Sequence, residues 1–389
     1  MMESGRTAPE TADALMAKVR AAVPVLAAHA DATEEGCRVA PESADALREA
    51  GAFALTTPRE FGGLGADLVS TVRVLSELGR GCPSSAWVAG ISAEAKGHFA
   101  KLLPDEVRAE LYADPHARMC AVGVPGEAVE VPGGVEITGR WSYASGSEDA
   151  DWAILAAMVA PGDGVPRVVG VLVPVSELSL ERTWRVAGLR GTGSHTLVAE
   201  GVFVPAVRVL EIPAGPDGAP DITLGEPLSL VAVGVMLAAP LAGAALGALD
   251  VVEGVLRKRK PPMTPYEDLA ASPSARQVFA EAEHLVNGGH DRLIHLAERI
   301  QGMLPGEGIP AAQRSAFRME IVSVLRQFLR AVDLLMDLHG SSGFSVDNPL
   351  QRYWRDLNVG ARHLQFTSYL TIENHGLLVT GAGEPILPV

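Results

Sequence analysis

Apolar side chains recur every three or four positions through most of the first hundred residues. This period is typical of amphipathic helices with one buried face. Pro and Gly residues interrupt the pattern where one helix should end and the next begin. The segments expected to be helical are Thr11–Ala30, Pro41–Gly51, Asp67–Arg80, Ser84–Leu103 and Pro104–Tyr112.

The pattern changes at about Met119 to short runs rich in Val, separated by Gly and Pro. Such runs predict strands joined by turns, and hence a small β domain that ends near Val209. The clearest runs are VEVPGGVEITG, WAILAAMVA, PRVVGVLVPV and HTLVAEGVFVP. The stretch Glu211–Ile222 is rich in Pro and Gly and is typical of a linker.

Long helical patterns return after the linker and continue to the end of the chain. Four such patterns in succession predict a helical bundle. They cover Leu228–Leu256, Ser274–Met303, Ala311–Leu338 and Asn348–Thr380. The order α, β, α therefore predicts an α+β protein with domains at 1–117, 118–222 and 223–389.

One uncharged segment, Leu228–Leu249, is long enough to span a membrane, and the basic run Arg257–Lys260 follows it. It is rich in Ala and Gly, which let helices pack closely inside a bundle or an oligomer. The N-terminus is acidic and has no apolar signal core. We therefore expect a cytoplasmic protein that does not enter a membrane.

The net charge, the cysteine spacing and the missing motifs argue against several other classes of function. The net charge of −15 argues against binding to nucleic acid, whose phosphates need a basic surface. The three Cys residues lie far apart without metal-ligand spacing, which favours free thiols and no metal site. No phosphate-binding loop or dinucleotide fingerprint occurs.

Four short motifs occur in a fixed order along the chain. They are PREFGGL at Pro58–Leu64, GRWSYASG followed by ADW at Ala150–Trp152, GLRGTGSHT at Gly188–Thr196, and NPLQRYWRD at Asn348–Asp356. Together with the α–β–α order they resemble the acyl-CoA dehydrogenase superfamily of flavoproteins over nearly the whole chain. The resemblance implies an N-terminal α domain, a middle β-barrel domain, a C-terminal four-helix bundle and a homotetramer.

The chain also departs from the dehydrogenases. No carboxylate follows Arg355-Asp356 where their catalytic Glu is common, and His363 stands near that place. The motifs that hold the adenine half of FAD are replaced by RKRKPPMTPYEDL and by Asp337–Ser341. These departures, with GCPSSAWV at Gly81–Val88, resemble the flavin-dependent two-component monooxygenases of this fold.

That branch implies a reaction and its partners. A separate reductase supplies reduced FMN or FAD, which reacts with O2 to give a C4a-hydroperoxide that needs a dry, hydrogen-bonded site. The expected substrate is a small aromatic molecule, phenolic or polyketide-like. The alternatives are an acyl-CoA dehydrogenase with a relocated base, an enzyme that N-hydroxylates an amino sugar, and a non-catalytic member of the family.

The resemblance assigns cofactor-binding roles to several residues. Ser145 would bond flavin N5 or O4, although it could be an ordinary turn serine. Trp141 would pack beside the flavin ring, although it could be a core aromatic of the β domain. Trp87 lies in the monooxygenase-type run and is expected beside the cofactor. Arg352 could hold a flavin phosphate or form an ion pair with Asp356.

Two histidines are candidates for acid–base catalysis. On one continuous helix, Arg352, Asp356 and His363 would share a face, so His363 could either act on substrate or peroxide or pair with Asp356. His98 follows Trp87 by eleven residues and lies near the same helical face. Lys96 could take the place of His98, and His98 could also be a packing residue.

Overall fold

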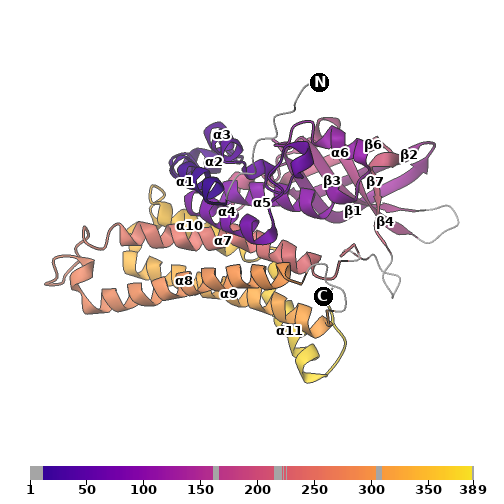
Figure 1. The fold of residues 1–389 in the computed structure, drawn as a ribbon. Helices are drawn as coiled ribbons and strands as arrows, with labels where there is room; N and C mark the ends of the chain where they lie inside the picture. The colour runs from indigo at the N-terminus through magenta and orange to yellow at the C-terminus, as the bar shows by residue number, and fades with distance from the viewer. Residues whose placement is uncertain are drawn as a thin grey trace.

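The computed structural model describes residues 12–160, 166–213, 221, 223–224, 226–303 and 309–387. Figure 1 shows three parts along the chain: a group of N-terminal helices, a β-sheet beside them, and a layer of long C-terminal helices. The α+β class and the order α, β, α are confirmed. The predicted domain limits lie between elements, and residue 222 is outside the described residues.

The first part contains six α-helices close to the predicted positions. Asp67 caps the fourth helix by accepting a hydrogen bond from the backbone N–H of Ser70, and Pro83 opens the fifth at a position where proline costs no hydrogen bond. The helices are α1 Ala12–Ala28, α2 Ala30–Gly36, α3 Pro41–Glu49, α4 Leu68–Gly81, α5 Pro83–His98 and α6 Asp105–Leu111.

The second part is a seven-stranded sheet in the order β5-β6-β2-β1-β3-β4-β7. Among the described strands only β1 and β3 pair in parallel, and β5 and β7 are the two end strands of the order. The strands are β1 Met119–Val131, β2 Gly134–Ala144, β3 Trp152–Val159, β4 Arg167–Pro174, β5 Ser179–Glu181, β6 His195–Pro205 and β7 Val209–Glu211. This seven-stranded sheet is the middle β domain that the sequence predicts.

The third part confirms three of the four predicted bundle helices. The fourth prediction, one helix over Asn348–Thr380, is wrong, because the chain forms two helices with a break between them. At the break the imidazole of His363 accepts a hydrogen bond from the backbone N–H of Gln365, and such local bonds compete with helical ones. The helices are α7 Ser229–Glu253, α8 Pro273–Gln301, α9 Ala311–His339, α10 Pro349–Gly360 and α11 Ser368–Thr380.

Helix α7 is the buried axis of the molecule rather than a membrane span. It is the one helix in the described part of the chain that is long and apolar enough to cross a membrane, and 83% of its most apolar window is buried. Its small residues let α4 approach closely: a Cβ added to Gly79 would lie 2.5 Å from the carbonyl oxygen of Pro240. Apolar residues of α1, α4, α5 and the bundle form one continuous core around it.

Candidate active site

Three predicted residues meet where helix α5, the end of strand β2 and the break after α10 come together. The indole N–H of Trp87 donates to the hydroxyl of Ser145 at 3.3 Å. The ring of His363 meets that of Trp87 edge to face, with 5.4 Å between centroids. Trp87 and Ser145 are both buried. Positions 87, 145 and 363, which come from the three parts of the chain, therefore form one site.

A row of hydroxyl groups leads away from Ser145. Ser145 Oγ lies 2.8 Å from Ser194 Oγ, and Ser194 Oγ lies 2.7 Å from Thr192 Oγ1. Thr192 Oγ1 donates to the carbonyl oxygen of Leu189 at 2.8 Å. All three hydroxyls are buried, so their hydrogen bonds exchange little with water.

The hydroxyl row has a fixed direction. A carbonyl oxygen only accepts, so the single proton of Thr192 is committed to Leu189. Ser194 must then donate to Thr192, and Ser145 must donate to Ser194. Ser145 already accepts from Trp87, and its remaining lone pair is left to accept one further hydrogen bond.

His363 is held as a neutral imidazole. Burial lowers its pKa to about 4. Its Nδ1 accepts from the backbone N–H of Gln365 at 3.4 Å, so the single ring proton of the neutral form lies on Nε2. The predicted helical pairing of His363 with Asp356 does not exist, because α10 ends before His363. The ring is therefore a hydrogen-bond donor through Nε2.

Trp141 lies inside the sheet instead of facing the site. Its side chain is fully enclosed, its indole N–H donates to the carbonyl oxygen of Ala156 at 2.8 Å, and its ring lies against Gly126. The pairing of β2 with β6 shifts register between Trp141 and Ala144, so both point inward. The structure thus places Trp141 as a core aromatic of the β domain, the alternative that the sequence left open, and its expected contact with the flavin stays a prediction.

The shift of register brings a different aromatic residue to the surface. Tyr143 has a φ of +65° and is 73% exposed. Its ring meets that of Trp184 edge to face at 5.7 Å. The sequence held a signal for Tyr143, since it lies two residues before Ser145 in GRWSYASG, but strict alternation would have placed it on the same face as Trp141.

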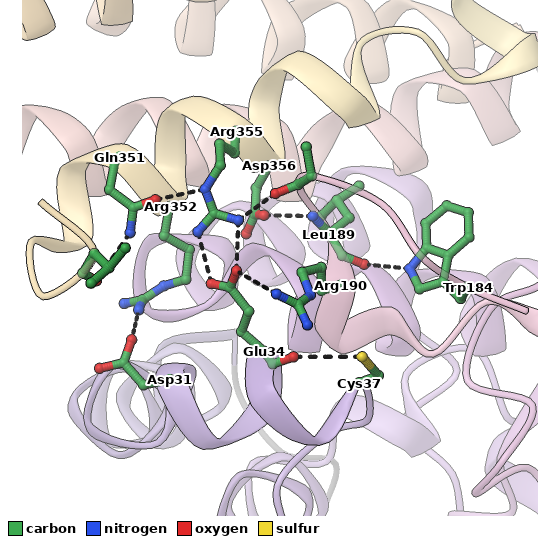
Figure 2. A network of polar contacts seen from close by, with 12 residues as sticks. Asp31, Glu34, Cys37, Trp184, Leu189, Arg190, Gln351, Arg352, Arg355 and Asp356 are labelled. Atoms are coloured by element: carbon green, nitrogen blue, oxygen red, sulfur yellow. Dashed lines mark hydrogen bonds and ion pairs between the residues drawn. The ribbon is translucent and has the colours of Figure 1, made fainter. Parts of the chain in front are cut away.

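The two arginines of helix α10 are already engaged. Arg352 pairs with Asp31, and Arg355 grips the carboxylate of Glu34 with bonds of 2.6 and 2.9 Å (Figure 2). Arg355 also donates to the carbonyl oxygen of Ala187. These contacts join α10 to α2 and to the segment before the hydroxyl row. The predicted pairing of Arg352 with Asp356 is absent among the described contacts. Arg352 instead joins helix α10 to helix α2 through Asp31.

Asp356 carries the contact that orders the hydroxyl row. Its Oδ1 accepts the backbone N–H of Leu189 at 2.5 Å (Figure 2). Leu189 has a φ of +53°, a conformation that residues other than glycine adopt only when their surroundings enforce it. Its carbonyl oxygen accepts from Trp184 Nε1 and Thr192 Oγ1. Burial raises the pKa of Asp356 to about 7.

His98 and Lys96 lie farther along α5. His98 is buried and its ring meets that of Phe99 at 4.5 Å. The ammonium group of Lys96 donates to the carbonyl oxygens of Phe53 and Pro115 and to the hydroxyl of Thr57. Burial lowers the pKa of Lys96 to about 7. Lys96 therefore fastens α5 to its neighbours, whereas the expected role of His98 stays a prediction.

Sequence reasoning missed the residues that complete the site. Thr192 and Ser194 lie in GLRGTGSHT, a motif whose resemblance to the family assigns no role to its hydroxyl groups. Their chemistry appears only once Leu189 folds them against Ser145. No group of three or more His, Cys, Asp or Glu side chains that could hold a metal ion occurs among the described residues.

Family comparisons agree with this architecture. Residues 9–111 match the acyl-CoA dehydrogenase N-terminal domain, and residues 235–368 match the acyl-CoA dehydrogenase C-terminal domain. The oxygenase component of FADH2-dependent resorcinol hydroxylase from Rhizobium sp. is 34% identical over 90% of both chains. The oxygenase subunit HsaA of a flavin-dependent monooxygenase from Rhodococcus jostii is 31% identical over 96% of this chain and 99% of its own.

Solved structures place the chain in the same group. XiaF from Streptomyces sp., in complex with FADH2 and glycerol, superposes with a TM-score of 0.88 at 28% identity over 97% of each chain. The chain belongs to the acyl-CoA dehydrogenase fold family and, within it, to the oxygenase components of flavin-dependent monooxygenases. It is thus a flavoprotein of the two-component type, whose reduced flavin comes from a separate reductase.

Replacing Asp356 with Ala should destabilise the protein by about 2–4 kcal/mol, because the buried N–H of Leu189 loses its acceptor. Asp356→Asn keeps an acceptor oxygen and serves as the matched control, with a loss of less than about half as much. Urea unfolding of both variants measures the difference. Equal losses for Ala and Asn would show that the hydrogen bond to Leu189 is not what Asp356 contributes.

The lowered pKa of His363 predicts a loss of stability in acid. The folded protein keeps the ring neutral down to about pH 4, whereas the unfolded chain protonates it near pH 6.5. Stability from this group is therefore complete above pH 6.5 and declines as the pH falls toward 4. His363→Asn should reduce the loss of stability between pH 7.5 and 5 by on the order of 1 kcal/mol. Parallel pH curves for both proteins would contradict this.

Proposed function

We propose that this protein hydroxylates a phenolic substrate at the Trp87–Ser145–His363 site. The observation that carries the proposal is the free lone pair of Ser145 beside a neutral imidazole in a buried setting. The names of two relatives support an aromatic substrate, since one is a resorcinol hydroxylase and another is an indole-3-acetate monooxygenase from Pseudomonas putida. Of these two substrates, resorcinol is the phenol.

The residues of the site suit a flavin ring. Ser145 offers a hydrogen-bonding oxygen to the N5 edge, and Trp87 orients that oxygen. The exposed ring of Tyr143, two residues before Ser145, and the half-buried ring of Trp184 against it offer aromatic surface. In the monooxygenase branch of this fold the bound reduced flavin would supply the activated oxygen for hydroxylation. With Trp141 enclosed in the sheet and Arg352 paired with Asp31, we assign the ring contact to Tyr143 and Trp184.

The direction of the hydroxyl row favours the reduced cofactor. Reduced flavin carries a proton on N5 and donates there, whereas oxidised flavin has a bare N5 that accepts. The hydroxyl of Ser145 already donates its single proton to Ser194, so it can only accept a further hydrogen bond. A donor at N5 therefore matches the site, while an acceptor at N5 would face the lone pair of Ser145. This mismatch is costly in a buried setting.

His363 contributes a donor on the other side of Trp87. Its Nε2–H can bind the oxygen that is transferred or the oxygen of the phenol, and its low pKa keeps it from acquiring a charge near neutral pH. A neutral donor in this position orients the acceptor oxygen without attracting water, as a buried charge would. The described residues therefore orient the acceptor oxygen and exclude water from the site.

Ser145→Ala tests the proposal. Loss of the hydroxyl should leave substrate binding within about threefold and shift oxygen use from hydroxylated phenol to released hydrogen peroxide by about tenfold or more. Purified protein with a flavin reductase, NADH, FMN and a phenol provides the assay, and peroxide is measured alongside product. Ser147→Ala removes a neighbouring buried hydroxyl that bonds Gly193 instead and is the control. An unchanged product-to-peroxide ratio in Ser145→Ala would reject the assignment.

The assembly and location of the protein extend the proposal. Large apolar side chains are exposed along the break and helix α11, at Leu364, Tyr369, Ile372 and Val379. An exposed apolar face of this kind on a helix supports burial in an oligomer, and we propose the homotetramer common in this family. A light-scattering mass of one chain at micromolar concentration would reject it. Burial of α7 supports a location in the cytoplasm.

A further inference from the structure

One face of helix α5 extends the site beyond Trp87. Trp87, Ile91, Glu94 and His98 follow the spacing of a single helical face. Their exposed fractions are 3%, 8%, 8% and 7%, whereas Ala95 and its neighbours on the other faces between 89 and 96 are 0–2% exposed wherever a value is given. Between residues 89 and 96, the side chains with residual solvent access are therefore Ile91 and Glu94, on the face that begins at Trp87.

The other faces of α5 are covered by protein. Ser92 Oγ accepts from the backbone N–H of Met119 at 3.1 Å, and the ammonium group of Lys96 donates to the carbonyl oxygen of Phe53. These contacts fix the rotation of α5 about its axis, so Glu94 has one direction to point: along the face that starts beside Ser145.

The helix that runs along α5 presents apolar residues. The ion pair of Lys101 with Glu226 at 2.8 Å places the segment before α7 near the C-terminal end of α5, and Gly90 lies next to Pro240 farther along. The two helices therefore run in opposite directions. Between these points α7 carries Val233 and Met236, each 8% exposed. Helix α7 therefore runs alongside α5 with an apolar segment that carries no charge between Ser229 and Leu249.

Glu94 stands out in these surroundings. No hydrogen bond or ion pair to its carboxyl occurs among the residues that the structure describes, although the residue is more than nine-tenths buried. Burial raises its pKa to about 8, so the group is an uncharged acid at neutral pH. An uncharged carboxyl offers one donor and one acceptor, and leaving both unmatched in an apolar setting is costly.

We propose that the Glu94 carboxyl binds an uncharged polar group of the substrate, at the end of the molecule remote from the carbon that is hydroxylated. This assignment rests on the proposed function. Seven residues of helix separate Trp87 from Glu94, about 10 Å along the axis. A single phenol ring with a short polar side chain, or a two-ring phenol with a second hydroxyl, spans that length. The substrate class is therefore an elongated, neutral phenol.

Substrate binding without turnover provides the test. Equilibrium dialysis under nitrogen, with protein and reduced FMN, measures the Kd of para-ethylphenol and of para-(hydroxyethyl)phenol, which differ in one hydroxyl. The wild type should bind the hydroxyethyl compound about tenfold more tightly. Glu94→Leu should abolish this preference and Glu94→Gln should keep most of it. Glu106→Leu alters an exposed carboxylate outside the α5 face and is the control.

The outcomes separate this inference from the proposed function. If wild type and Glu94→Leu show the same ratio of Kd values while hydroxylation proceeds, the role of Glu94 is rejected and the proposed function stands. If the wild type binds neither compound and hydroxylates neither, the phenolic substrate class itself is rejected. Should Glu94→Leu fail to fold, Glu94→Met against Glu94→Gln gives the same comparison, and equal ratios again reject the role.

Discussion

A hydrogen bond from the backbone N–H of Leu189 to the buried carboxyl of Asp356 fixes the turn on which the polar site depends. It joins the bundle to the turn before β6, while Arg355 on the same helix joins the bundle to α2 through Glu34. The turn that it fixes contains a left-handed leucine whose carbonyl oxygen receives the end of the hydroxyl row. The polarity of the site therefore depends on a contact that never touches a ligand.

The arrangement of cores explains why such a contact is needed. The N-terminal helices and the bundle share one apolar core around α7, whereas the sheet has a core of its own. A third apolar cluster, with residues of α5, α6, β1, β3, β4 and β7, packs the N-terminal helices against the sheet. The edge of the sheet that holds Ser145 differs, because hydrogen bonds join it to α5 and to α10 and form a polar boundary. Directional hydrogen bonds and ion pairs set position more strictly than apolar contact, which is non-directional. The boundary is where Ser145 must be placed against Trp87 and His363.

The sequence predicted most of the fold because periodicity and breakers are local signals. It also identified Trp87, Ser145 and His363, through motifs, before their contact was visible. It could not reveal the shift of register after Trp141, since alternation assumes an uninterrupted strand. It joined α10 to α11 although α10 ends at Gly360, because the side-chain cap of His363 that begins the next turn leaves no mark in the spacing of apolar residues. The roles of Thr192, Ser194 and Glu94 depend on neighbours distant in sequence, so spacing alone carried no sign of them.

The row of hydroxyls has a consequence for protons as well as for cofactor choice. A wire of hydroxyl groups conducts protons only when both ends can exchange them. This one terminates at the backbone oxygen of Leu189, which holds no exchangeable proton and passes none on. The row therefore orients Ser145 firmly but provides no path for protons from bulk water to the reacting oxygen. The protein thus has a rigid polar contact in its interior, and this contact does not carry protons inward from an acidic solvent.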